Sequence, residues 1–289
     1  MQRTLIGLTK LLRYRFLLIA GLFPYALGAA VAYYTQGQFS LFLFLIGITG
    51  LFFALMGVEA FNEFFDWRMG TDRVFQLNPQ PVPNSTFLVG MAAFFVALVV
   101  AIFLTLELGP PIIVLSLMGL FIALFYLAPP IKLAYRGFGE IMISLSYGPL
   151  MMMGSYYVQV QRLDFLPLFV SVIPALLLFA ISIMNEVPDY FQDRLAGKRN
   201  ICVRIGQKNV VRLYGAVLAL FYVVLLVGLL SGRFPWVAWV LLACLPISLL
   251  SYTTGVKTYD NPYRFVSAIR YMIMQYIIIL GVLITGYIV

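Results

Sequence analysis

Residues 41–66 read LFLFLIGITGLFFALMGVEAFNEFFD, an apolar run that ends in a cluster of polar and acidic side chains. No charged residue occurs between positions 41 and 58. A helix of about 20 such residues crosses a hydrocarbon core about 30 Å thick. This stretch therefore predicts a transmembrane helix, spanning 41–62, with carboxylates at one end.

Similar apolar runs recur along the whole chain of 289 residues. Hydrophobic residues make up 63% of the sequence and charged residues 10%, whereas ordinary soluble domains are about 25% charged. The bilayer must therefore be the solvent for most of the surface, and no segment is left over for a second domain. We predict an all-α polytopic membrane protein, a single domain over residues 1–289, with nine transmembrane helices in one bundle. The predicted spans are 16–35, 41–62, 87–106, 111–128, 138–158, 166–186, 210–231, 235–253 and 266–288.

The basic residues sort to one side of this predicted topology. With a cytoplasmic N-terminus, the cytoplasmic side holds seventeen of the nineteen Lys and Arg residues, and the other side holds Arg162 and Arg233. This distribution follows the positive-inside rule. It places the N-terminus and the acidic loops on the cytoplasmic side of a cell membrane. It also accounts for the net charge of +8 without a nucleic-acid partner, and no feature indicates an obligate protein partner.

Six of the eleven acidic residues fall in two short runs that match each other. Asn62-Glu-Phe-Phe-Asp66, continuing to Asp72, and Asn185-Glu-Val-Pro-Asp189, continuing to Asp193, both begin Asn-Glu-x-x-Asp. They end the second and sixth predicted helices, 123 residues apart, which indicates an internal duplication. Spacings of four residues put the oxygens of each run on one helical face, and Pro188 predicts a kink in the second run.

Several carboxylates at the same membrane depth need an electrostatic partner. The chain has no histidine, and oxygen ligands without His or Cys suit Mg²⁺. Lys198 and Arg199, which follow the second run closely, add the positive charge that an oligophosphate needs. One run alone is more simply a solvated helix end, whereas two matching runs on the same side of the membrane favour a metal and phosphate site.

These residues resemble the UbiA superfamily of intramembrane prenyltransferases, whose members have two Asp-rich motifs on helices two and six of a nine-helix bundle. The similarity extends to YLAPPIKLAYRGFGE (126–140), DRLAGKR (193–199) and VRIG (203–206), and so covers nearly the entire chain. It is closest to the branch that contains the 1,4-dihydroxy-2-naphthoate prenyltransferases of menaquinone synthesis. Residues 77–84, LNPQPVPN, depart from that branch, which commonly has a Gly- and Arg-containing run there.

The resemblance implies that an allylic isoprenyl diphosphate binds between the two runs and that an aromatic or other lipophilic acceptor takes up its isoprenyl group. Asp66, Asp189, Asp193 and Tyr126 are the implied catalytic residues, with Tyr126 offering a cation–π face. The implied Mg²⁺ ligands are Asn62, Asp66, Asp72, Asn185, Asp189 and Asp193. The implied diphosphate contacts are Arg15, Lys132, Arg136, Lys198 and Arg199.

Two alternatives stay open at the level of sequence. Prenyl transfer to a glycerophosphate lipid precursor, as in archaeal lipid synthesis, differs only in the acceptor. A membrane transporter is the alternative from another class, because repeated halves and intramembrane charges also mark transport pathways. Transport sites lie near the bilayer midplane, however, whereas these acids gather at one membrane edge.

Overall fold

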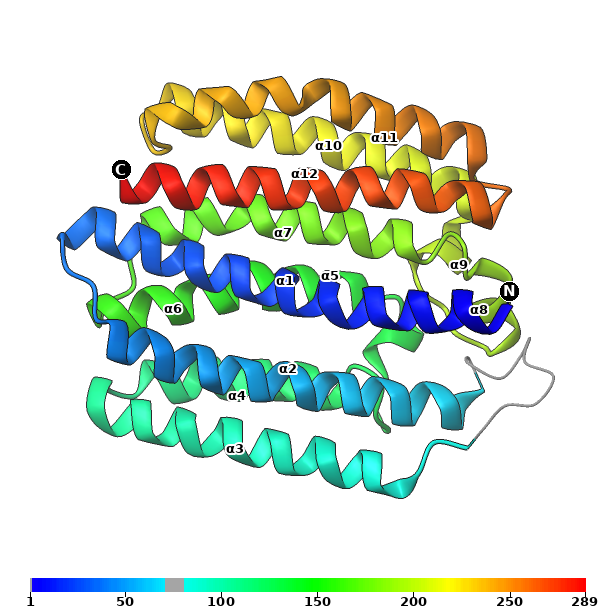
Figure 1. The fold of residues 1–289 in the computed structure, drawn as a ribbon, viewed down its shortest axis with the longest axis horizontal. Helices are drawn as coiled ribbons and strands as arrows, with labels where there is room; N and C mark the ends of the chain where they lie inside the picture. The colour runs from blue at the N-terminus through cyan, green and yellow to red at the C-terminus, as the bar shows by residue number, and fades with distance from the viewer. Residues whose placement is uncertain (1, 71–80) are drawn as a thin grey trace.

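The computed structural model describes the backbone of residues 2–70 and 81–289 and the side chains of residues 19–70 and 81–289. Within these ranges the chain is helical, with no strand, and the long helices run side by side along the longest axis of the molecule (Figure 1). In chain order the elements are α1 (Gln2–Gln36), α2 (Leu41–Met69), α3 (Asn84–Leu108), α4 (Pro111–Phe125), η1 (Leu133–Arg136), α5 (Gly139–Leu145), η2 (Ser146–Leu150), α6 (Met151–Val160), α7 (Phe165–Asn185), α8 (Tyr190–Leu195), α9 (Ile201–Ile205), α10 (Gln207–Leu230), η3 (Trp236–Cys244), α11 (Leu245–Thr258) and α12 (Pro262–Ile288).

The observed helices coincide with the apolar stretches of the sequence. Among the described residues, six helical segments are long and apolar enough to cross a membrane: α2, α3, α7, α10, the continuous pair η3–α11, and α12. The shorter α4 is also apolar. The predicted span 138–158 corresponds to α5, the π-helical turn η2 and α6 in succession, because Pro149 interrupts the regular hydrogen bonding there. The all-helical membrane architecture is thus confirmed, and the count of nine crossings stays a prediction.

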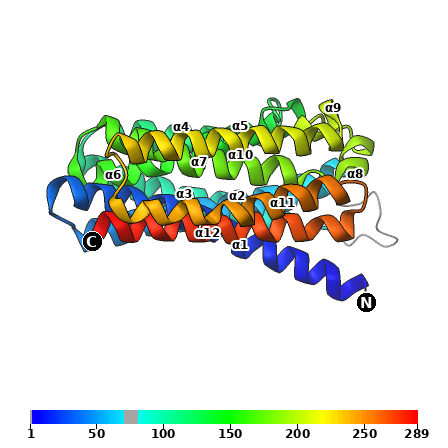
Figure 2. The ribbon, with the colours of Figure 1, turned by 90° about the horizontal axis from the view of Figure 1, so that it is seen from above.

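The two ends of the bundle differ. Helix α1 begins at the end that holds the short helices α8 and α9, and α12 finishes at the opposite end (Figures 1 and 2). The carboxyl ends of α2 and α7 both lie at the end with α8 and α9 (Figure 1). We call this the α8 end. The first acidic run lies in the last turns of α2, and the second begins at the last residue of α7. The fold therefore brings both runs to the same end of the bundle.

Close helix packing depends on small residues at the contacts. A Cβ atom on Gly28 of α1 would lie 2.4 Å from the carbonyl oxygen of Met152 on α6, and one on Gly57 of α2 would lie 2.7 Å from the Phe94 ring on α3. Such small residues let apolar helices approach each other where no hydrophobic force drives them together. Across α1 and α12, the fully buried Tyr276 donates a hydrogen bond to the carbonyl oxygen of Ala20 at 2.9 Å.

The outward faces of the helices are apolar. Large hydrophobic side chains such as Phe95 and Leu106 on α3, Leu230 on α10 and Val240 on η3 are 56–81% exposed. A soluble protein does not present so many apolar side chains to water. These faces are suited to contact with lipid, in agreement with an integral membrane protein.

Candidate active site

The first acidic run lies within the last two turns of α2. Asn62 and Asp66, one turn apart, face the same way and are each 8% exposed. The helix continues to Met69, seven residues beyond the predicted span, and ends at Gly70 in a left-handed conformation (φ 89°) that glycine adopts without strain. Asp72 lies outside the described residues.

The second run is divided between two helices. Helix α7 ends at Asn185, residues 186–189 form a turn, and α8 begins at Tyr190. Pro188 has no N–H group to donate, so the chain breaks here rather than bending within one helix. Asn185 and Asp189 therefore do not share a continuous helical face, contrary to the helical spacing expected from sequence. The spacing holds between Asp189 and Asp193, because the Asp193 N–H donates to the Asp189 carbonyl oxygen at 2.8 Å.

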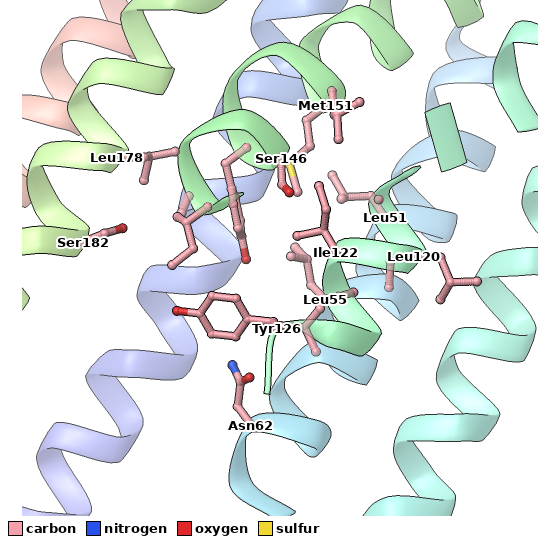
Figure 3. Close-up of a pocket in the computed structure, with 18 of the residues that line it drawn as sticks. Leu51, Leu55, Asn62, Leu120, Ile122, Tyr126, Ser146, Met151, Leu178 and Ser182 are labelled. Atoms are coloured by element: carbon pink, nitrogen blue, oxygen red, sulfur yellow. The ribbon is translucent and has the colours of Figure 1, made fainter. Parts of the chain in front are cut away.

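Both runs border one cavity of about 1150 Å³. At its polar end, near the α8 end of the bundle, it is lined by side chains of both runs together with Tyr126 and Lys198. The residues of the runs that line it are Asn62 and Asp66 from the first run and Asn185, Glu186, Pro188, Asp189, Gln192 and Asp193 from the second. Tyr126, Asn62, Leu55 and Ile122 all line this cavity, and Figure 3 shows them around the same space. The cavity therefore joins an oxygen-rich mouth to an apolar interior.

A buried ion-pair network fixes the turn after α7. The Lys198 Nζ atom lies 3.1 Å from Glu186 Oε2 and 3.3 Å from Asp193 Oδ2, and these side chains are 13%, 15% and 2% exposed. Asn200 donates to both carboxylates, at 2.7 Å for Asp193. Burial raises the pKa of Asp193 to about 9, the Glu186 carboxylate adds to the rise, and the Lys198 ammonium opposes it. Lys198 and Asp193, predicted separately as a diphosphate contact and a metal ligand, are thus bonded to each other.

The oxygen donors at the mouth fit Mg²⁺. Within the described ranges, no three Asp, Glu, Cys or His side chains converge into a ready-made metal cage. Mg²⁺ needs none, since it usually takes one or two carboxylates and completes its shell with water and phosphate oxygens. Asp66 of α2 and Asp189 of the turn after α7 both line the mouth with carboxyl groups, and Asn62 and Asn185 line it with amide groups, so these side chains could hold the ion.

Most of the other predicted basic contacts do not reach the cavity. Lys132 takes a left-handed conformation (φ 50°) just before η1, with its ammonium 5.9 Å from the Tyr135 ring. Arg136 is exposed and donates to the Pro130 carbonyl oxygen at 3.2 Å, and Arg199 is exposed as well. None of these three basic side chains lines the cavity. Arg15 lies on α1, outside the residues whose side chains are described.

Sequence reasoning missed four polar residues in or near the site. Glu186 belongs to the shared Asn-Glu-x-x-Asp core, and that repetition was a usable signal. Asn200 both caps α9 and holds Asp193, for which no sequence signal existed. Glu140 is 2% exposed and accepts a hydrogen bond from the Ile201 N–H at 2.8 Å. Arg270 of α12 lines the cavity. An arginine inside a predicted apolar span indicates a functional role, but the positive-inside rule had already accounted for this residue as a topology signal.

Apolar helices around a cavity with an oxygen-rich mouth define a membrane-embedded protein with a site for an amphiphilic ligand. The chain belongs to the UbiA prenyltransferase family, whose model matches residues 21–277, and it is a prenyltransferase. The resemblance inferred from the sequence motifs is thereby confirmed, and the transporter alternative is wrong.

Curated relatives and a solved structure agree with this assignment. The 1,4-dihydroxy-2-naphthoate octaprenyltransferase of Bacillus subtilis is 23% identical over 76% of this chain and 73% of its own. The 2-carboxy-1,4-naphthoquinone phytyltransferase of Synechocystis is 28% identical over 83% of this chain and 79% of its own. A UbiA homolog from Archaeoglobus fulgidus, solved with GPP and Mg²⁺ bound, shares the fold with a TM-score of 0.61 and 16% identity, over 93% of this chain and 99% of that one.

Proposed function

We propose that this protein transfers an isoprenyl group from an allylic isoprenyl diphosphate to an aromatic acceptor of the naphthoate type within the membrane. The observation that carries the proposal is the shared cavity: two acidic runs 123 residues apart in sequence border one polar mouth, and an apolar interior continues from it. An amphiphile with a diphosphate head and an apolar chain matches both parts.

The side chains at the mouth have separate tasks in this proposal. Asn62 and Asp66 on one wall and Asn185 and Asp189 on the other hold Mg²⁺, which supplies positive charge to the departing pyrophosphate. Lys198 holds Glu186 and Asp193 in place and adds positive charge beside the same wall. Asp193 and Asp72 remain proposed ligands.

The apolar part of the cavity protects the reacting carbon. When the C–O bond to the diphosphate breaks, the electron pair leaves with pyrophosphate and the allylic carbon becomes cationic. The Tyr126 ring lies between the polar mouth and the apolar interior, where its face can stabilise such a cation (Figure 3). The acceptor ring then forms the new C–C bond and gives up a proton, while the apolar lining excludes water that would otherwise capture the cation.

The proposal of an aromatic acceptor is supported by the two relatives, which are named for a naphthoate and a naphthoquinone acceptor. A glycerophosphate acceptor is the second candidate. It is tested directly by product mass, because the two products differ in their acceptor moiety.

We further propose nine crossings, with α5–η2–α6 forming one and η3–α11 another, and with the α8 end facing the cytoplasm. The distribution of basic residues supports this orientation. Cysteine accessibility at engineered sites on the two ends, measured in sealed vesicles, tests it.

Purified protein in lipid nanodiscs, supplied with Mg²⁺, labelled isoprenyl diphosphates and a panel of naphthoates, other quinone precursors and glycerophosphates, tests the function. We expect a prenylated aromatic product and complete loss of turnover with EDTA. A product formed only with glycerophosphates would overturn the acceptor assignment.

Asp66→Ala and Asp189→Ala test the assigned roles. Each variant should lose turnover while keeping its thermal midpoint. Asp260→Ala is the matched control, because Asp260 is an exposed aspartate between α11 and α12 that does not line the cavity. Full activity in either of the first two variants would contradict the roles proposed for these carboxylates.

A further inference from the structure

The cavity reaches almost through the membrane-spanning layer. It is lined along α2 from Asp66 down to Gly47, nineteen residues apart, which at about 1.5 Å per residue is about 28 Å. The hydrocarbon core of a bilayer is about 30 Å thick. The volume of about 1150 Å³ also exceeds the usual range of about 300–1,000 Å³ for small-molecule sites. The cavity is therefore longer than a diphosphate and an aromatic ring require.

The deep part of the cavity is suited to a hydrocarbon chain. It is lined by Val100, Leu104, Ile112 and Leu115 from α3 and α4. Leu55 of α2 and Leu120 of α4 line the part nearer the mouth, and Leu51 of α2 and Met151 of α6 line the space farther in (Figure 3). Since the deep part is continuous with the polar mouth, its occupant is the apolar chain of a ligand whose head lies at that mouth.

Two of the glycines in the wall are needed for helix packing. A Cβ atom on Gly47 would lie 1.8 Å from the Tyr25 hydroxyl oxygen, and one on Gly50 would lie 2.8 Å from a Val100 methyl group. Larger residues at these two positions would push neighbouring helices apart.

Gly119 of α4 and Gly154 of α6 are different. Both line the cavity, and a Cβ atom on either one would meet nothing within 4 Å. Neither has a positive φ. Glycine is a poor helix former, and here neither packing nor backbone conformation requires it. The missing side chains leave open space inside the cavity.

The two glycines lie at different depths. Tyr126 and Gly139 mark the same level near the mouth, because a Cβ atom on Gly139 would lie 3.2 Å from the Tyr126 ring. Gly119 is seven residues from Tyr126, or about 10 Å along the helix axis. Gly154 is fifteen residues from Gly139, or about 22 Å.

We propose that Gly119 and Gly154 are specificity-determining positions that set how long an isoprenyl chain the cavity accepts. The inference rests on the proposed function, since it takes the occupant of the deep part to be the chain of the donor. A larger side chain at Gly154 blocks the deep part and excludes long donors. The same change at Gly119 blocks the cavity nearer the mouth and excludes shorter donors as well.

The test compares kcat/KM for geranyl, farnesyl, geranylgeranyl and octaprenyl diphosphates in the wild type, Gly119→Leu and Gly154→Leu, with one acceptor that the wild type prenylates. Gly281→Leu is the matched control: a Cβ atom on Gly281 of α12 would also meet nothing within 4 Å, but this glycine does not line the cavity. Each variant is first checked for an unchanged thermal midpoint, and the smaller Gly→Val changes replace any leucine variant that unfolds.

We expect Gly154→Leu to lower kcat/KM about tenfold or more for the longest donors and to leave the shortest unchanged, because inserted methylene groups have no room beside a chain that fills the cavity. Gly119→Leu should extend the loss to shorter donors, and Gly281→Leu should keep the profile of the wild type. Folded variants with the donor preference of the wild type, or with equal losses for all donors, would overturn this inference and leave the proposed function standing. A wild type that transfers no isoprenyl chain would overturn both.

Discussion

Replacing Lys198 with methionine leaves two buried carboxyl groups without the ammonium group that lies 3.1 Å from Glu186 and 3.3 Å from Asp193. Glu186 is the ionised member of the two, and at an effective dielectric constant of about 20 its pair with Lys198 contributes about 5 kcal/mol of Coulomb energy before desolvation is counted. Desolvation offsets most of this, and removing one partner of a buried pair costs about 3–5 kcal/mol. Asn200 still bonds both carboxyl groups, and Asp193, whose pKa is raised to about 9, is already protonated at neutral pH, so only Glu186 loses an oppositely charged partner. We therefore expect a loss of about 3 kcal/mol, the lower end of that range.

Thermal unfolding in detergent with a thiol-reactive dye measures this loss, since Cys202 and Cys244 are both free and buried. The expected fall of the thermal midpoint for Lys198→Met is about 6–12 °C, without any substrate present. Arg199→Met is the control: its side chain is exposed, and the midpoint should change by about 1 °C or less. A midpoint for Lys198→Met equal to that of the wild type would refute a structural role for the ion pairs and leave Lys198 only its proposed contact with the diphosphate.

Three other side chains give separate predictions. Tyr126→Phe keeps the aromatic face and most of kcat, whereas Tyr126→Leu should lower kcat about five- to thirtyfold; equal rates for the two variants would rule out the cation–π role. Glu140→Ala leaves the Ile201 N–H without its acceptor and should lower the free energy of unfolding by about 1–3 kcal/mol, seen as a lower midpoint in the dye assay; an unchanged midpoint would contradict this. Arg270 lines the cavity, and we expect its guanidinium to bind the diphosphate; Arg270→Gln should therefore raise KM for the donor about tenfold with little change in kcat, and an unchanged KM would contradict this contact.

The sequence predicted the helices well because the bilayer makes a simple demand. A crossing helix must be apolar over about 20 residues, and the lengths of α2, α3, α7 and α12 follow from that requirement. The boundaries depend on local chemistry that hydropathy does not contain. Helix α2 continues to Met69 because Gly70 ends it, and α7 stops at Asn185 because the chain turns before Pro188.

The site was predicted in part. Repetition of Asn-Glu-x-x-Asp located both walls of the mouth, because two helices that end on the same side can bring such runs together. Which basic residues face the cavity was not predictable from their distance along the chain. Lys198 lies next to the second run because its N–H donates to the Asp193 carbonyl oxygen at 2.9 Å. Lys132 adopts a left-handed backbone conformation, and its side chain does not line the cavity. Such turns depend on tertiary contacts, which a linear pattern does not encode.

In the proposed mechanism, the two acidic runs bind one diphosphate through shared Mg²⁺. A double-mutant cycle on Asp66 and Asp189 tests it most directly, with the Kd of inorganic pyrophosphate measured in the presence of Mg²⁺. We predict that each single alanine variant weakens binding and that the double variant loses less than the two single losses combined, by about 0.5–3 kcal/mol. Losses that add within about 0.5 kcal/mol would show that the two runs act on separate ligands and would contradict the proposed function.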